Sequence, residues 1–263
     1  MPAVRPRFAS LSEVSLPTLH QMAGRLGFAW LAGWFWVLCL VVLPLHVALL
    51  AYPSQWGRRW AHQVNRGWGA ILLLVSGVWV RQRGQQRPLP AGPVIFVSNH
   101  RSYLDIPILH RVLPGDYQFL GKRELAQLPL FGFMYNRVHL ALDRGNPTAA
   151  AASLRRAEES LRRGTSLVIF PEGTSRGTRL LSPFKEGAFV LATQSGCPIV
   201  PICIQGSRER LPTGRRLFWP GRVCLTRGPV LAPTAATTPT NLRQQAFTWI
   251  ETELTDGSNR RPD

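Results

Sequence analysis

The feature that most constrains this chain is an uncharged run near its N-terminus. Phe28 to Tyr52 reads FAWLAGWFWVLCLVVLPLHVALLAY and contains no Asp, Glu, Lys or Arg over 25 residues. As one helix it would be about 37 Å long, against about 30 Å for the hydrocarbon core of a bilayer. Three tryptophans near one end and a tyrosine at the other suit interfacial anchors. The run predicts a membrane-embedded helix, or a shallow hairpin if Pro44 breaks it.

A second apolar run, WGAILLLVSGVWV, covers the 13 residues from Trp68 to Val80. It is too short to span a bilayer easily and predicts an interfacial or re-entrant helix, or one packed on the first. Arginines lie between the runs and after the second, which suits an anionic cytoplasmic leaflet: Arg58, Arg59, Arg66, Arg81, Arg83 and Arg87. A buried helical hairpin is the alternative; a signal peptide fits less well, because the run is long, starts late and lacks an A-x-A site. We expect residues 1–90 to anchor the chain to a membrane.

From residue 91 to residue 263 the pattern changes to short apolar runs that alternate with helix-like stretches. The expected strands are Val94–Val97, Tyr117–Leu120, Val138–Leu142, Leu167–Phe170, Ile199–Ile204 and Val223–Thr226. The expected helices are Pro147–Arg163, which Asn146 can cap, then Lys185–Gln194 and Asn241–Leu254, before a frayed tail from Gly257. This alternation predicts an α/β layered fold with a largely parallel sheet flanked by helices.

The chain is strongly basic, with 31 Lys and Arg residues against 14 acidic ones and a net charge of +17. Such an excess favours a polyanionic partner, either nucleic acid or an anionic membrane surface. The arginines are scattered and no nucleic-acid-binding module is present, so we expect membrane lipids and no nucleic acid. The four cysteines have no zinc spacing, which predicts buried thiols and no metal site.

The stretch VIFVSNHRSYLD places a histidine directly after a strand and an acid five residues later. Asp105-Ile106-Pro107 predicts a helix start with an acidic cap, and a helix that runs to about Val112. His100 then lies in the loop between strand and helix. Because a loop separates them, the Asp105 carboxylate can fold back onto the imidazole and fix one tautomer as a general base. The alternative is a helix cap beside an incidental histidine.

Three further segments end a strand in a similar way. SLVIFPEGTSRG (Ser166–Gly177), FLGKRELAQLPLFG (Phe119–Gly132) and IVPICIQGS (Ile199–Ser207) each bring glycines and polar or charged residues to a strand end. In a parallel sheet these ends meet at one edge. We therefore expect a base, an acid, a lysine and arginines on one rim.

These motifs resemble those of the glycerolipid acyltransferase family, whose best-known members are the 1-acylglycerol-3-phosphate acyltransferases. NHRSYLD matches its N-H-x4-D motif, and GKREL…DR, FPEGTSR…PFKEGA and VPICI resemble its second, third and fourth motifs in order, over about Pro93 to Gly206. One departure is Ser175-Arg176, where the commonest third motif has arginine before serine. The phosphate-binding arginine is then shifted by one position, or Arg179 shares its role.

The resemblance implies transfer of an acyl chain from acyl-CoA or acyl carrier protein to 1-acylglycerol-3-phosphate, which gives phosphatidic acid, with no cofactor. It implies that His100 and Asp105 are catalytic and that acceptor-binding residues come from the later motifs: Lys122, Arg144, Glu172, Gly173, Thr174 and Arg176. Fixed cations suit the acceptor phosphate, and backbone N–H groups in the turns suit the oxyanion. We expect Lys185 to be a surface charge and the domain to lie on the cytoplasmic face of a membrane, a bacterial inner membrane.

Other readings stay open. Within the family, the acceptor could be another lyso-lipid such as lyso-ornithine lipid. Gly173-Thr174-Ser175-Arg176-Gly177 also spells the G-x-S-x-G elbow of serine hydrolases, but no histidine follows His139. A non-enzymatic membrane-binding protein is the third reading. The remaining histidines have no evident site context: His20, His46, His62, His110 and His139.

Overall fold

The computed structural model describes residues 18–51, 55–84, 88–129, 131–142, 147–175 and 179–259. Its helices are α1 (Leu19–Ala51), α2 (Gln55–Val75), α3 (Asp105–Val112), α4 (Phe131–Val138), α5 (Pro147–Arg162), α6 (Gly187–Ser195), α7 (Ser207–Arg210) and α8 (Pro239–Asn259), with a 3₁₀ turn, η1 (Arg123–Gln127). Its strands are β1 (Val78–Arg83), β2 (Ile95–Ser98), β3 (Tyr117–Lys122), β4 (Leu140–Leu142), β5 (Ser166–Ile169), β6 (Ile199–Gln205) and β7 (Gly221–Arg227).

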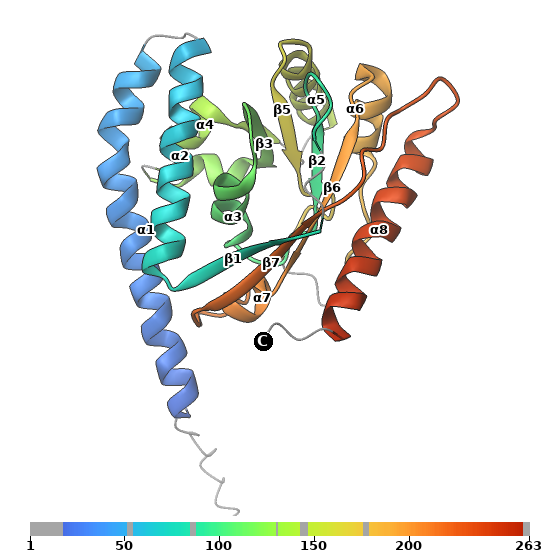
Figure 1. Cartoon of the computed structure of the whole chain (residues 1–263). Helices are drawn as coiled ribbons and strands as arrows, with labels where there is room; N and C mark the ends of the chain where they lie inside the picture. Colours follow the sequence, from blue (N-terminus) through green and yellow to red (C-terminus); the bar gives the residue numbers. More distant parts are fainter. Residues whose placement is uncertain are drawn as a thin grey trace, which may run out of the picture.

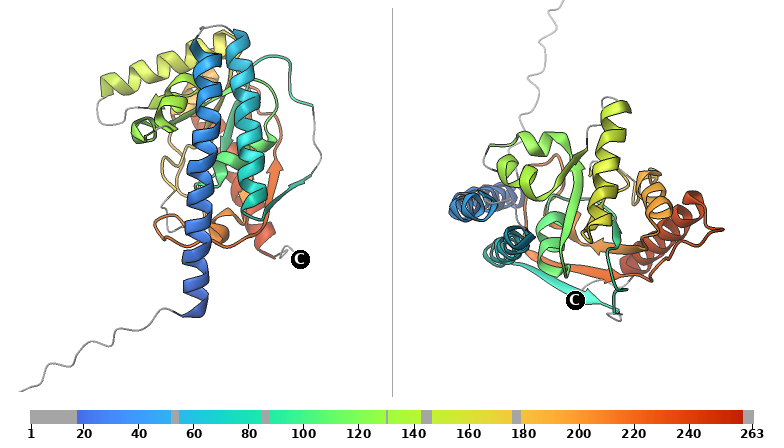
Figure 2. Two further views of the ribbon diagram at one scale, coloured as in Figure 1. Left: turned by 90° about the vertical axis from the view of Figure 1, so that its left-hand side faces the viewer. Right: turned by 90° about the horizontal axis from the view of Figure 1, so that it is seen from above.

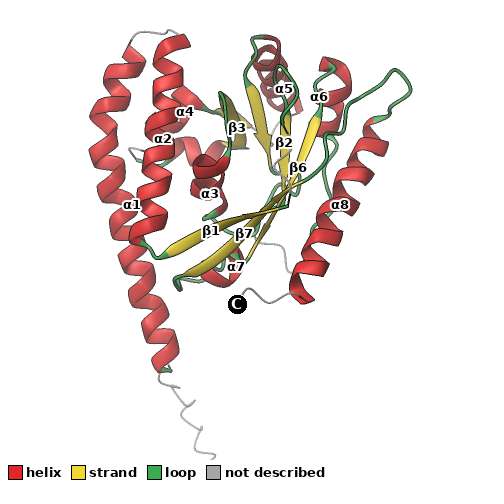
Figure 3. Ribbon diagram, in the orientation of Figure 1, coloured by secondary structure: helices red, strands yellow, loops and turns green. Residues whose placement is uncertain are grey.

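The strands form one sheet in the order β1-β7-β6-β2-β5-β3-β4 (Figures 1 and 3). All neighbouring pairs are parallel except β6 and β7, which are antiparallel. The predicted α/β fold with a largely parallel sheet is confirmed. Because β6, β2, β5, β3 and β4 are parallel neighbours, their carboxyl ends share one edge of the sheet.

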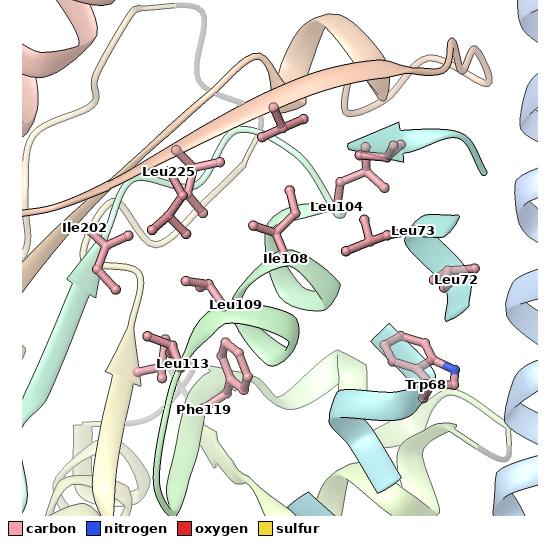
Figure 4. Close-up of a cluster of buried hydrophobic side chains, with 14 of the residues drawn as sticks. Trp68, Leu72, Leu73, Leu104, Ile108, Leu109, Leu113, Phe119, Ile202 and Leu225 are labelled. Atoms are coloured by element: carbon pink, nitrogen blue, oxygen red, sulfur yellow. The ribbon is translucent and has the colours of Figure 1, made fainter. Parts of the chain in front are cut away.

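Alternating side chains of the strands face two hydrophobic cores, as the two-residue period of a strand requires. Phe96 of β2 points into a core shared with α1, α2 and α3, whose side chains include Trp68 and Ile108 (Figure 4). Its neighbours Ile95 and Val97 point into the other core, beneath α5, α6 and α8. Helices therefore cover both faces of the sheet (Figure 2).

The two N-terminal helices lie side by side, and α2 packs between α1 and α3. Helix α1 continues through Pro44 without a break, so the hairpin that we considered at this proline is wrong. By length and composition α1 could cross a membrane, and only 17% of its most apolar stretch of 18 residues is buried. Its exposed apolar side chains, among them Leu26, Leu40 and Val41, would be costly in water and suit a lipid environment.

The second apolar run is not one helix. Helix α2 begins earlier, at Gln55, and ends at Val75, and the chain then enters β1, which pairs with β7. Gly77 has φ +65°, and the left-handed conformation that this glycine allows ends the helix. Arg59 and Arg66 accordingly lie on α2, while Arg81 and Arg83 lie on β1. The expected division at residue 90 stays a prediction, although β1 already belongs to the sheet.

Smaller differences concern the ends of elements. Val138, expected in a strand, ends α4, because the helical bonding continues with His139 N donating to Tyr135 O. Helix α8 extends past Gly257, where we expected a frayed tail. Helix α5 starts at Pro147 as expected, while the proposed cap Asn146 lies outside the described residues.

Candidate active site

His100 and Asp105 form a hydrogen-bonded pair in the loop between β2 and α3. The Asp105 Oδ2 atom lies 2.9 Å from His100 Nδ1 and also accepts hydrogen bonds from the backbone N–H groups of Arg101 and Ser102, at 2.9 Å each. With Nδ1 donating to the carboxylate, Nε2 is the nitrogen left to accept a proton. The predicted contact is confirmed, and its geometry is that of a general base oriented by an acid.

The prediction that Asp105 caps α3 is wrong. Leu104 occupies the cap position, and Asp105 is the first residue of the helix. The carboxylate turns back to the N–H groups of the preceding loop, where the three donors hold it. Its side chain is only 1% exposed. A carboxylate buried this deeply needs its hydrogen-bond donors. These contacts favour the interpretation that Asp105 positions His100 over the interpretation that it caps the helix.

The loop that carries His100 is tied to its surroundings on both sides. The Asn99 side chain donates to Ile204 O and accepts from Ile204 N, both at 2.8 Å, which binds the loop to β6. Ser102 Oγ donates to Leu211 O at 2.9 Å, in the segment after α7. We did not single out Asn99 in the sequence, because its partner on the neighbouring strand β6 is 105 residues away in the chain.

Glu172 links the His100 loop to the loop after β5. Its Oε1 accepts from His100 N at 2.7 Å, and its Oε2 accepts from Ser182 N at 2.9 Å. Burial raises the pKa of the Glu172 carboxyl, and the two backbone N–H groups oppose this shift. Both carboxylate oxygens of Glu172 thus accept hydrogen bonds from the backbone. The expected contact of Glu172 with the acyl-acceptor substrate stays a prediction.

A cavity of about 360 Å³ begins beside His100 and runs among α1, α2, α3, α4 and β3. The His100 ring stacks on Phe170 with a centroid distance of 4.1 Å, and Phe119 continues this aromatic wall. The lining is mainly apolar and aromatic: Val42, Trp68, Tyr103, Ile106, Phe119, Leu120, Phe131, Tyr135 and Phe170. Such a cavity suits a flexible hydrocarbon chain.

Besides His100, several polar side chains interrupt the apolar lining: Asn65, His110, Glu124, His139, Thr174 and Ser175. Burial, together with the neighbouring histidines, lowers the pKa of His110 to about 3 and that of His139 well below its usual value. Both imidazoles are therefore neutral near pH 7. We expected these two histidines to have no site context; both are buried and line the cavity, and α3 and the end of α4 bring their rings to a centroid distance of 5.5 Å.

The other predicted site residues come from neighbouring parallel strands. Gly173 and Thr174 line the cavity, and Gly173 has φ +72°, which a side chain would strain. Lys122 ends β3, the strand beside β5, but its side chain lies outside the described part. Arg144 and Arg176 also lie outside the described residues. The predicted phosphate site therefore stays a prediction.

The serine-hydrolase alternative finds no support in the described residues. After Ser175 no helix starts in the part that the structure describes until Gly187, so the strand–turn–helix of a serine hydrolase elbow is not formed there. Within the same residues, no group of three or more His, Cys, Asp or Glu side chains could hold a metal ion.

Comparison with known proteins agrees with this geometry. Residues 80–205 match the family model described as Acyltransferase.

The chain is also similar to curated proteins named 1-acyl-sn-glycerol-3-phosphate acyltransferase. It is 31% identical to the chloroplastic 1-acyl-sn-glycerol-3-phosphate acyltransferase BAT2 of Brassica napus, over 68% of this chain and 52% of the relative. It is 38% identical to the 1-acyl-sn-glycerol-3-phosphate acyltransferase of Cocos nucifera, over 65% of this chain and 53% of the relative. The chain thus spans about half the length of the curated relatives it matches.

A solved structure shares the fold. The crystal structure of the 1-acyl-sn-glycerophosphate acyltransferase PlsC from Thermotoga maritima aligns with a TM-score of 0.78 and 21% identity. The alignment covers 93% of this chain and 100% of that protein. At this identity the likeness is one of fold, and it includes the N-terminal helices.

Proposed function

We propose that this protein transfers a fatty acyl chain from a thioester donor to the free hydroxyl of 1-acylglycerol-3-phosphate, which gives phosphatidic acid. The observation that carries the proposal is the His100–Asp105 pair at an apolar cavity of about 360 Å³. If His100 is the base, a substrate with a hydrocarbon chain in this cavity would react beside it.

In the proposed reaction, His100 Nε2 removes the proton of the acceptor hydroxyl as its oxygen attacks the thioester carbonyl carbon. Asp105 stabilises the imidazolium that forms. The tetrahedral intermediate then collapses, the carbon–sulfur bond breaks, and the imidazolium returns the proton to the leaving thiolate. The products are an ester and a free thiol, and the thioester itself needs no activation by a protein nucleophile.

The cavity is the proposed site of the fatty acyl chain. Its opening beside His100 and Phe170 would place the thioester carbonyl near the base, while the chain lies along Phe119. Holding the two reacting groups together in this way can account for a large part of a rate enhancement.

We propose that Lys122, Arg144 and Arg176 bind the acceptor phosphate. Lys122 ends β3, and the segments that carry the two arginines follow β4 and β5 in the chain. These three strands lie on one side of β2 in the sheet, in the order β2-β5-β3-β4. A phosphate held at these strand ends would place the glycerol hydroxyl near His100.

The first 90 residues would hold the enzyme on a membrane, with the domain from residue 91 on the cytoplasmic face of a bacterial inner membrane. Exposed apolar side chains on α1, such as Leu26 and Leu40, support this placement. Lyso-ornithine lipid is the alternative acceptor, and both acyl-CoA and acyl carrier protein remain candidate donors.

The test measures thiol release by the detergent-solubilised protein with both donor types and a panel of lyso-lipids. We expect lysophosphatidate to be the best acceptor. Changing Lys122, Arg144 or Arg176 to Ala should lower kcat/KM for lysophosphatidate by about 10–150-fold, since a charged hydrogen bond is worth about 1.5–3 kcal/mol, while KM for the donor changes little.

The matched control is Lys185→Ala, which removes an exposed lysine at the start of α6 and should leave both values within about twofold. Undiminished use of lysophosphatidate by all three variants, or a preference for a phosphate-free lyso-lipid, would move the acceptor site and favour the alternative.

A further inference from the structure

The segment that precedes β7 packs against the N-terminal half of α1. Phe218 N donates to Gly24 O at 2.9 Å, and the Trp219 ring stacks on His20 with centroids 4.9 Å apart. A Cβ on Gly24 would lie 2.7 Å from Trp219, and one on Gly27 would lie 2.5 Å from Phe218 O. The two glycines therefore allow a close approach that a larger residue would prevent.

This packing creates an open groove of about 790 Å³ between the two segments. Its charged lining consists of three arginines, Arg25 from α1 and Arg215 and Arg216 from the segment before β7. All three are exposed, and no ion pair is found for them among the described residues. No acidic side chain lines the groove in the part of the chain that the structure describes. Three guanidinium groups that converge without counter-charge favour an anionic ligand.

The rest of the groove has two apolar side chains and one uncharged polar side chain, and it adjoins the exposed face of α1. Phe28 and Leu217 complete the lining together with Gln21. Next to them on α1, the side chains of Leu26 and Trp30 are 73% and 55% exposed. The ligand chemistry that this surface fits is therefore an amphiphile, with an anionic head for the arginines and a hydrocarbon part for the helix.

Arg25 also marks the polar end of the apolar helix. It is the last arginine or lysine before the uncharged stretch, and the next one along the chain is Arg58. Arginine at such a boundary lies at the level of lipid headgroups. Figure 1 shows that this half of α1 extends past the sheet, on the side where β7 begins.

From these observations we infer that Arg25, Arg215 and Arg216 form a binding site for the anionic phosphate headgroup of a membrane phospholipid. This site is separate from the cavity at His100 and does not depend on the proposed acyl transfer. Its occupant is a resident membrane lipid with a net negative headgroup.

The test measures lipid binding to the detergent-solubilised full chain by native mass spectrometry, with phosphatidylglycerol, phosphatidylcholine and inorganic phosphate as separate probes. Phosphatidylglycerol should bind more tightly than phosphatidylcholine, which carries a cation that the arginines repel. The double variant R215Q/R216Q should bind phosphatidylglycerol about 10-fold more weakly or worse, because it removes charge-assisted hydrogen bonds to the phosphate.

The matched control is R155Q/R156Q, which removes the same charge from exposed positions on α5. It should keep the affinity of the unaltered protein. If R215Q/R216Q fails to fold, the single variant R25Q on α1 tests the same site and should also weaken binding.

Three results would overturn the inference. An equal loss of affinity in both double variants would mean that the net charge of the protein, rather than this groove, determines lipid binding. Equal affinity for the two lipids would rule out recognition of a net negative headgroup. Inorganic phosphate that binds as tightly as phosphatidylglycerol would show that the site binds the free ion rather than a lipid. The outcome is distinguishable from failure of the proposed function, because binding is measured without turnover.

Discussion

The Asp105→Asn variant should distinguish two roles of Asp105: orienting the His100 imidazole, or only starting helix α3. In the structure one oxygen of Asp105 accepts three N–H groups, from His100, Arg101 and Ser102, each at 2.9 Å. The Asn side chain has the same shape, and its one oxygen can still accept from the two backbone groups. We therefore expect the loop and α3 to remain folded in the variant.

The loss should appear in turnover. A hydrogen bond to a charged group is worth about 1.5–3 kcal/mol, and the attraction between a carboxylate and an imidazolium about 4 Å apart is about 4 kcal/mol at an effective dielectric constant of about 20. Asp105 is 1% exposed, so water screens this pair weakly. A loss of about 2–4 kcal/mol of transition-state stabilisation corresponds to about 30–1,000-fold in kcat.

The assay is thiol release at saturating donor and acceptor, with circular dichroism and membrane association as checks on folding. Asp116→Asn is the control, because Asp116 contacts His62 Nε2 at 2.7 Å in a second histidine–aspartate pair that does not line the cavity. It should keep activity within a few-fold. If Asp105→Asn retains more than about a tenth of the turnover, or if the two variants lose activity equally, the orienting role is refuted.

Further expectations concern the base, the buried acid and the membrane. His100→Ala should lose at least about 100-fold in turnover while the protein stays folded, and residual activity above about a tenth would exclude it as the base. Burial raises the pKa of Glu172, so its ionised form is disfavoured in the folded protein, and its contribution to folding is lost as pH rises through that raised pKa. The melting temperature of the protein relative to the Glu172→Gln variant should therefore fall as pH rises above about 4, the ordinary pKa of a glutamate carboxyl, and a constant difference would contradict this. The protein should stay in the membrane fraction in high salt and in carbonate; release without detergent would show that residues 28–80 do not anchor it.

The sequence predicted what depends on local spacing. The five-residue separation of His100 and Asp105, with a strand before and a helix after, allowed their contact, and the resemblance of the further motifs favoured it over a plain helix cap. Alternation of strands and helices likewise predicted the parallel sheet. The end of α2 was harder, because the apolar pattern continues from Leu74 to Val80 and only Ser76-Gly77 marks the change to β1.

The cavity could not be predicted in this way. Val42, Asn65, His110 and Tyr135 line it from four different helices, and none of them has a sequence neighbour that indicates a site. Buried imidazoles have no signature in the sequence that distinguishes them from exposed ones. The arginine groove on α1 also depends on a tertiary contact, since Arg25 and Arg215 are far apart in the chain.

The pairing of β1 with β7 limits how this protein can be shortened. Only Ser76 and Gly77 separate α2 from β1, and β1 forms the end of the sheet. Deletion of the apolar N-terminus through residue 90 would therefore leave β7 with unpaired N–H and C=O groups, an open edge that invites sheet-to-sheet aggregation. A water-soluble form would instead have to begin between Val75 and Val78. It would also need polar replacements on the face of α3 that α2 covers in the intact chain.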